Sequence, residues 1–144
     1  MASTNDRESL AAELERHMAE EGEILREYRA LSSKLAEGPV SFLIDRILTE
    51  EEMHHFLLHT LSDWLRTPPT SGGSPAAKGA DRDAILRHTS LLREHEKKTI
   101  ADCRGLVPRL SGEGGELYEA LLEAIALDSE KHDRLLAAVE KLLA

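Results

Sequence analysis

Apolar residues recur every three or four positions along most of the chain, a spacing typical of amphipathic helices. Four long segments carry this pattern, and the breaks between them fall at Gly38–Pro39, at a Pro/Gly/Ser-rich stretch and near Pro108 and Gly112. The pattern predicts helices over residues 6–36, 39–66, 82–106 and 116–143, with a linker over residues 67–80.

The lengths of the connections predict how these helices are arranged. Two short connections flank one longer one, which predicts two helical hairpins in a single antiparallel four-helix bundle over residues 1–144. Residues 47–58 align without gaps on residues 125–136, and the two stretches share an isoleucine, an acidic pair, a histidine and a Leu-Leu pair. Asn5 and Glu8 have the spacing of a capping box, and Pro39 suits a first helical position.

Each expected helix has a line of residues facing the bundle centre that is apolar at its ends and polar in its middle. The polar members are Glu21 with His17, Glu51 with His54, Glu96, and Asp128 with His132. An uncompensated buried carboxylate costs several kcal/mol, so we expect bound cations to stabilise this cluster. A turn that places residue 107 opposite residue 115 puts Glu94 beside Asp128, so Glu94 stays an alternative to Glu96.

These residues resemble the ferritin-like di-metal carboxylate proteins, a group that includes rubrerythrins and bacterioferritins. In that family two helices each supply one Glu, and the other two each supply a Glu-x-x-His motif. Glu21 and Glu96 match the lone glutamates, and Glu51 with His54 matches the first motif. His132 matches the second motif, but Ser129 stands at its glutamate position, and Asp128 is the nearest substitute.

The resemblance implies a metal-dependent oxidoreductase of the ferroxidase or peroxidase type. The implied cofactor is two iron ions, with manganese as an alternative, and the implied small-molecule substrate is O₂ or peroxide. Carboxylates with a few imidazoles suit these metals. The ligands would be Glu21, Glu51, His54, Glu96, Asp128 and His132. His17 would be a further ligand or would orient Glu21, whereas Tyr28 would relay an electron or, more simply, be a hydrogen-bonded core residue.

Two other classes of function stay open. A hemerythrin-like bundle is suggested by the spacing of His17 with Glu21 and of His55 with His59, although the latter pair lies off the inward line. A metal-free helical interaction module is suggested by Ser129, and it would bind no metal and would not respond to chelation.

Net charge, cysteine content and further apolar residues bear on binding partners and cellular compartment. The 144 residues carry a net charge of −9, which argues against binding to nucleic acids or anionic membranes. Cys103 is the only cysteine, which fits a reducing cytoplasm. Apolar residues beside the core line lead us to expect a homodimer. They are Met18, Leu25, Leu43, Leu57 and Leu136.

Overall fold

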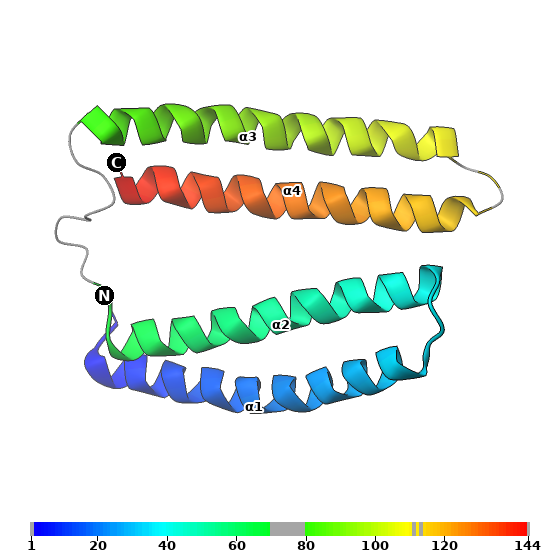
Figure 1. The fold of residues 1–144 in the computed structure, drawn as a ribbon. Coiled ribbons are helices and arrows are strands. Elements are labelled where there is room, and N and C mark those ends of the chain that lie inside the picture. Colours follow the sequence, from blue (N-terminus) through cyan, green and yellow to red (C-terminus); the bar gives the residue numbers. More distant parts are fainter. Residues whose placement is uncertain (1, 70–79, 111, 113, 144) are drawn as a thin grey trace. The chain divides into compact units, whose positions relative to one another are not determined.

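The computed structural model is all-helical across the residues that it describes, namely 2–69, 80–110, 112 and 114–143 (Figure 1). The helices are α1 (Thr4–Lys34), α2 (Pro39–Arg66), α3 (Ala80–Leu106), the short 3₁₀ helix η1 (Val107–Leu110) and α4 (Gly115–Leu143). The all-α class is confirmed, and the four expected helices lie within about one turn of their predicted limits. Most of the predicted linker, residues 70–79, lies outside the described residues.

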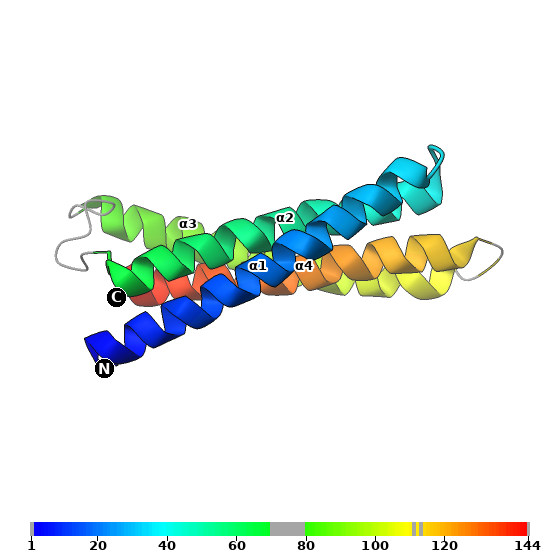
Figure 2. The same ribbon diagram turned by 90° about the horizontal axis from the view of Figure 1, so that it is seen from below.

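The chain divides into two compact units, Met1–Gly72 and Gly73–Ala144. In the first unit α1 packs antiparallel to α2, and in the second α3 packs antiparallel to α4 (Figures 1 and 2). The two predicted hairpins are thereby confirmed, and they are the parts from which an antiparallel four-helix bundle is built. No helix in the described part of the chain combines the length and apolar composition of a membrane span.

The helix ends show how local sequence sets the boundaries. The capping box at the start of α1 is formed by Ser3 and Asp6, not by Asn5 and Glu8. The Ser3 hydroxyl accepts a hydrogen bond from the Asp6 backbone N–H at 3.1 Å, and Asp6 accepts one from the Ser3 backbone N–H at 3.1 Å. The capping box therefore lies two residues earlier than expected, and α1 begins at Thr4.

The turn into α4 requires glycine. Gly114 has a φ of 80°, in the left-handed region that other residues rarely adopt. A Cβ atom on the next residue, Gly115, would lie 2.5 Å from the backbone oxygen of Leu110. Two successive glycines therefore allow η1 to fold back closely onto the start of α4.

Small residues occupy the most buried positions of both hairpins. Ala11 and Ser62 are 0% and 2% exposed in the first hairpin, and Ala126 and Ser129 are 0% and 4% exposed in the second. Leu25 is the one large aliphatic side chain among the buried residues, at 5% exposure. Small side chains at a helix contact allow the two axes to approach closely, so the seam of each hairpin is narrow.

The predicted inward lines combine two faces of each helix. On α2 the predicted line includes Ile47, Leu58 and Leu61. Leu58 lies in the seam with α1, together with Leu48 and Ser62, whereas Ile47 and Leu61 are 39% and 48% exposed. A two-helix hairpin buries only the stripe between its helices. The remainder of the predicted line forms an adjacent apolar face that the hairpin itself does not cover.

The residues predicted to form a dimer interface differ in their exposure. Leu25 is buried within the first hairpin, so it is not available to a second copy. Met18, Leu43 and Leu136 are half-buried, and Leu57 is 48% exposed.

Arginine pairs join the helices of each hairpin at equivalent places. Arg29 of α1 pairs with Glu52 of α2 at 3.3 Å, and Arg104 of α3 pairs with Glu130 of α4 at 2.8 Å. Glu52 and Glu130 coincide in the ungapped alignment of residues 47–58 on 125–136. The internal repeat seen in the sequence is thus also a repeat of interhelical contacts.

We predict that Ala126→Leu lowers the free energy of unfolding by about 1–3 kcal/mol, because the seam at Ala126 has no room for three more carbon atoms. Urea denaturation followed by circular dichroism measures the change. Ala120→Leu makes the same substitution at an exposed position of α4 and should alter stability by less than about 0.5 kcal/mol. Equal effects of the two substitutions would contradict the tight seam.

A second prediction concerns Arg93, which lies at the middle of α3. Arg93 donates hydrogen bonds to Asp133 at 2.8 Å and to Glu140 at 2.9 Å. The hydrogen bond from Arg93 lowers the pKa of Asp133 below its usual value. A carboxyl whose pKa is lowered by folding stabilises the protein above its unfolded pKa, and this stabilisation is lost as the pH falls through the folded pKa.

Asp133→Asn should therefore lower the melting temperature at pH 7, and its difference from the wild type should shrink as the pH falls below about 4. Thermal unfolding between pH 7 and pH 2.5 tests this. Glu119→Gln, at an exposed position of the same helix, is the control. A melting-temperature difference that persists at low pH would show that charge is not the cause.

Candidate metal centre

Two carboxylates of the first hairpin lie against each other near the middle of the seam. The side chains of Glu21 on α1 and Glu51 on α2 are only 16% and 23% exposed. The pKa of Glu51 is raised by burial and by its hydrogen bond and like-charge interaction with Glu21. Ionising both carboxyls at the same time is therefore unfavourable.

A histidine accompanies each of these carboxylates. His17 Nε2 lies 3.3 Å from Glu21 Oε1, one turn away on α1, and His54 Nδ1 lies 3.7 Å from Glu51 Oε1, one turn away on α2. The two imidazoles are about half exposed, at 56% and 50%. Both line a hollow of about 310 Å³ together with Glu21, Leu57 and Leu58. The first hairpin therefore brings together three predicted ligands and His17.

One oxygen of this cluster lacks a hydrogen bond. Glu21 Oε2 is buried and has no donor among the described residues. A buried carboxylate oxygen without a donor is unfavourable, and a cation would satisfy it. The chemistry of the donor set, two carboxylates and two imidazoles, fits iron or manganese.

The second hairpin pairs a carboxylate with a histidine across its seam. His132 Nδ1 of α4 lies 3.4 Å from Glu96 Oε1 of α3, and the Glu96 side chain is 18% exposed. Glu94, by contrast, is 72% exposed and pairs with Lys97 on its own helix at 3.4 Å. The structure thus places Glu96, not Glu94, beside a predicted ligand. The register differs from the expected one because η1 extends the arm of α3 to Leu110, so Leu110, not residue 107, lies beside Gly115.

The position that departs from the family pattern is part of the helix contact. Ser129 lies in the seam with α3 and is 4% exposed. In the ungapped alignment it stands where the first hairpin has Glu51. Asp128, the expected substitute, is 28% exposed and its Oδ1 lies 3.4 Å from Lys131 Nζ on the same helix. At this position the second hairpin therefore has a serine where the first has the carboxylate of Glu51.

The predicted ligands are thus gathered into two sets, one on each hairpin. Across the described ranges, no group of three or more His, Cys, Asp or Glu residues is arranged so that it could hold a metal ion. The six predicted ligands belong to two units. A single centre that uses all six stays a prediction.

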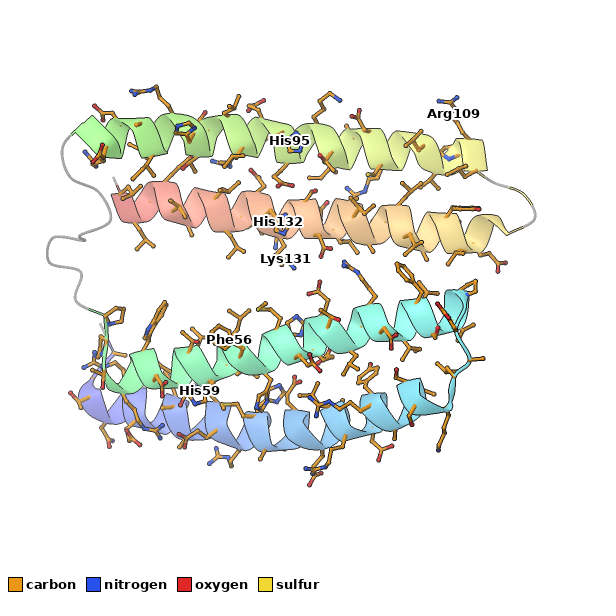
Figure 3. The ribbon with its side chains drawn as sticks, in the orientation of Figure 1. Phe56, His59, His95, Arg109, Lys131 and His132 are labelled. Carbon is orange, nitrogen blue, oxygen red and sulfur yellow. The ribbon has the colours of Figure 1, made fainter. Side chains whose placement is uncertain are left out.

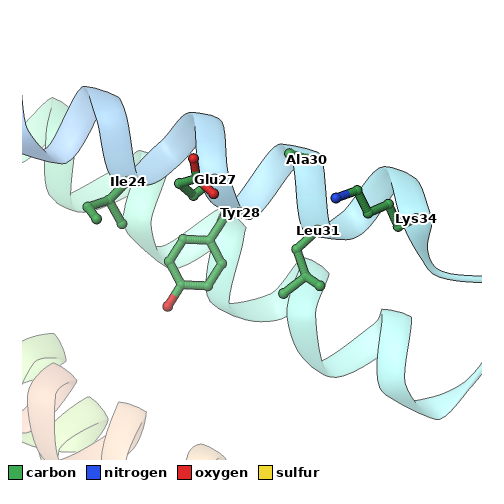
Figure 4. Close-up of a pocket in the computed structure, with 6 residues that line it drawn as sticks. All are labelled: Ile24, Glu27, Tyr28, Ala30, Leu31 and Lys34. Carbon is green, nitrogen blue, oxygen red and sulfur yellow. The ribbon is translucent and has the colours of Figure 1, made fainter.

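Two further residues near this region were not singled out as ligands. His55 Nδ1 is buried in the first hairpin and has no hydrogen-bond partner among the residues that the structure describes. Its place in the seam follows the heptad spacing from Leu48 to Ser62, which is the signal that could have identified it. Tyr28 lines a separate hollow of about 470 Å³ on α1, together with Ile24 and Leu31 (Figure 4).

Comparison with known proteins adds no relative. No family model matches the chain, no curated protein is significantly similar to it, and no solved structure matches its fold.

We predict that Glu51→Gln raises the melting temperature of the protein in the presence of a chelator. The substitution removes the like charge beside Glu21 while keeping the shape of the side chain. Glu23→Gln, at an exposed position of α1, is the control and should have little effect. A lower melting temperature for Glu51→Gln would show that the two carboxylates do not repel each other in the metal-free protein.

Proposed function

We propose that the chain is a ferritin-like di-metal carboxylate protein that holds two iron ions, or iron and manganese, and acts as a ferroxidase or peroxidase-like oxidoreductase on O₂ or peroxide. The observation that carries the proposal is the pairing of Glu21 and Glu51 in the first hairpin, with His17 and His54 at the same hollow. Such a concentration of carboxylates in a helical seam is costly unless a cation is bound.

The apolar residues around the histidines support the assembly of a bundle. At 100° per residue, Ile24 and Ile47 fall on the same side of the first hairpin as His17 and His54. Ile125 and Val139 stand in the same relation to His132 in the second hairpin. These aliphatic side chains are 38% to 49% exposed. Packing the two faces together would bury them and would bring the two ligand sets toward a common centre.

In the proposed centre each hairpin supplies one side of the ligand set. Glu21, Glu51 and His54 would come from the first hairpin, and Glu96, Asp128 and His132 from the second. The metal pair would supply the electrons that reduce O₂ or peroxide. The chain's own residues supply negative charge that favours the oxidised metals, and His17 would orient Glu21 through its contact with Oε1.

The two sides would not be equivalent. Because Ser129 replaces a glutamate in the second hairpin, the first hairpin offers the larger number of charged oxygens in its seam. We therefore expect the metal position nearer to Glu21 and Glu51 to fill first.

A metal-free helical interaction module is the second candidate function, and the buried Ser129 is the observation that favours it. The hemerythrin-like alternative has less support, because His55 lies in the seam whereas His59 is exposed and pairs with Asp63 at 3.3 Å. The two histidines of that motif therefore face different surroundings.

We predict about two iron or manganese ions per chain after anaerobic loading with Fe(II), measured by elemental analysis. His54→Ala and Glu51→Ala should each remove metal and oxidase activity while the protein stays helical by circular dichroism. His59→Ala is the matched control on the same helix, because His59 pairs only with Asp63 among its described ion pairs.

The outcomes of this experiment separate the candidates. About one metal ion per chain would mean that serine in place of glutamate at residue 129 has abolished one of the two metal-binding positions. Stoichiometric metal retained in both variants would refute the ligand assignment. An absence of bound metal, even after loading, would favour the interaction module.

A further inference from the structure

Helix α2 carries a second apolar stripe that is separate from its contact with α1. Phe42, Met53, Phe56 and Trp64 are 58%, 53%, 64% and 53% exposed. At 100° per residue, these four side chains lie on the opposite side of α2 from Leu48, Leu58 and Ser62 of the seam. Figure 3 shows Phe56 on the side of α2 that is turned away from α1. We call these four residues the aromatic stripe.

The aromatic stripe concentrates a scarce residue type. The chain has two Phe, one Trp and two Tyr, and both Phe and the Trp belong to the stripe. The side of α1 opposite Ala11 and Leu25 carries charged residues instead, namely Arg16, Glu20, Glu23 and Glu27. Large exposed aromatic side chains gathered on one helix mark an interaction surface more often than scattered apolar residues do.

In the proposed bundle, the second hairpin would pack on a face of the first hairpin other than the aromatic stripe. The exposed aliphatic residues beside His17 and His54 come from both α1 and α2. In the bundle of the proposed function, on which this step rests, the second hairpin would cover that face. The aromatic stripe belongs to α2 alone and would remain for a different partner.

The spacing of the stripe is self-complementary. Phe42, Met53 and Trp64 are separated by eleven residues each, which is three helical turns. If two copies of α2 pack antiparallel about a two-fold axis at Met53, then Met53 meets Met53 and Phe42 meets Trp64 of the second copy. A two-fold interface requires this kind of self-complementary patch.

We propose that the aromatic stripe is the interface of a homodimer, in which two copies of α2 pack antiparallel about Met53. The matching positions span about 33 Å of helix at 1.5 Å per residue. Each of the four side chains contributes on the order of 100 Å² per copy, so the stripe alone buries roughly 800 Å² in a pair. Stable interfaces bury about 1,200–2,000 Å², so we expect a reversible dimer that dissociates on dilution.

Sedimentation equilibrium in buffer that contains a chelator measures the association directly. We expect the wild type to form a dimer at hundreds of micromolar and to dissociate at low micromolar, with a red shift in the emission of Trp64, the only tryptophan. Phe42→Asp and Met53→Asp should each weaken association at least tenfold without loss of helicity, because both side chains are exposed. Leu127→Asp, at an exposed leucine of α4, is the matched control and should leave association unchanged.

Cross-linking tests the register. In a Cys103→Ala background, Met53→Cys should form an intermolecular disulfide readily under mild oxidation. Thr60→Cys lies on the same side of α2, but an antiparallel pair centred on Met53 separates its two copies by about 21 Å along the helix. A parallel pair would cross-link both variants equally.

Several results would overturn the proposal. These are a monomer at every concentration, association that survives Phe42→Asp and Met53→Asp, and equal cross-linking of Met53→Cys and Thr60→Cys. A monomer with concentration-independent Trp64 emission would point to coverage of the stripe within one chain. The chelator makes these outcomes independent of whether the proposed metal centre exists.

Discussion

A helix in a two-helix hairpin can bury only the stripe that faces its neighbour, and every other feature of this protein depends on that limit. The seams here are lined at their most buried positions by small residues such as Ala11, Ser62, Ala126 and Ser129. The helices therefore approach closely, but the seam removes little apolar surface from water. Among the described residues no large side chain is fully buried, so the hairpins retain apolar faces that require further partners.

Two carboxylates of the first hairpin, those of Glu21 and Glu51, lie close together within this narrow seam. Glu21 and Glu51 are held together although their charges repel, and one oxygen of Glu21 has no donor among the described residues. Arginines of the same hairpin pair with other carboxylates: Arg29 with Glu52, and Arg66 with Glu8 and Glu15. Glu21 and Glu51 have histidines as their ion-pair partners in the described part of the chain.

The two hairpins share one interhelical contact but differ in the residues around it. Arg29 with Glu52 and Arg104 with Glu130 preserve the same interhelical contact in both. At the adjacent position the hairpins differ, because Glu51 corresponds to Ser129, and in the second hairpin His132 lies beside Glu96 of the facing helix. The outer sides differ as well, since Met53 and Phe56 of the aromatic stripe correspond to Lys131 and Arg134 of α4 in the alignment.

Periodicity and breakers in the sequence determined the helices, their pairing and the half-buried place of Glu21, Glu51 and Glu96, because these depend on spacing along one helix and on short turns. The tertiary structure decided what depends on the exact register between helices. It placed His132 beside Glu96, because η1 extends the arm of α3 to Leu110 and shifts the register of α4 in a way that the pattern does not encode. It also separated the seam from the faces beside it, because an apolar residue such as Leu25 or Ile47 fits the same helical period whether it meets its own hairpin or another partner.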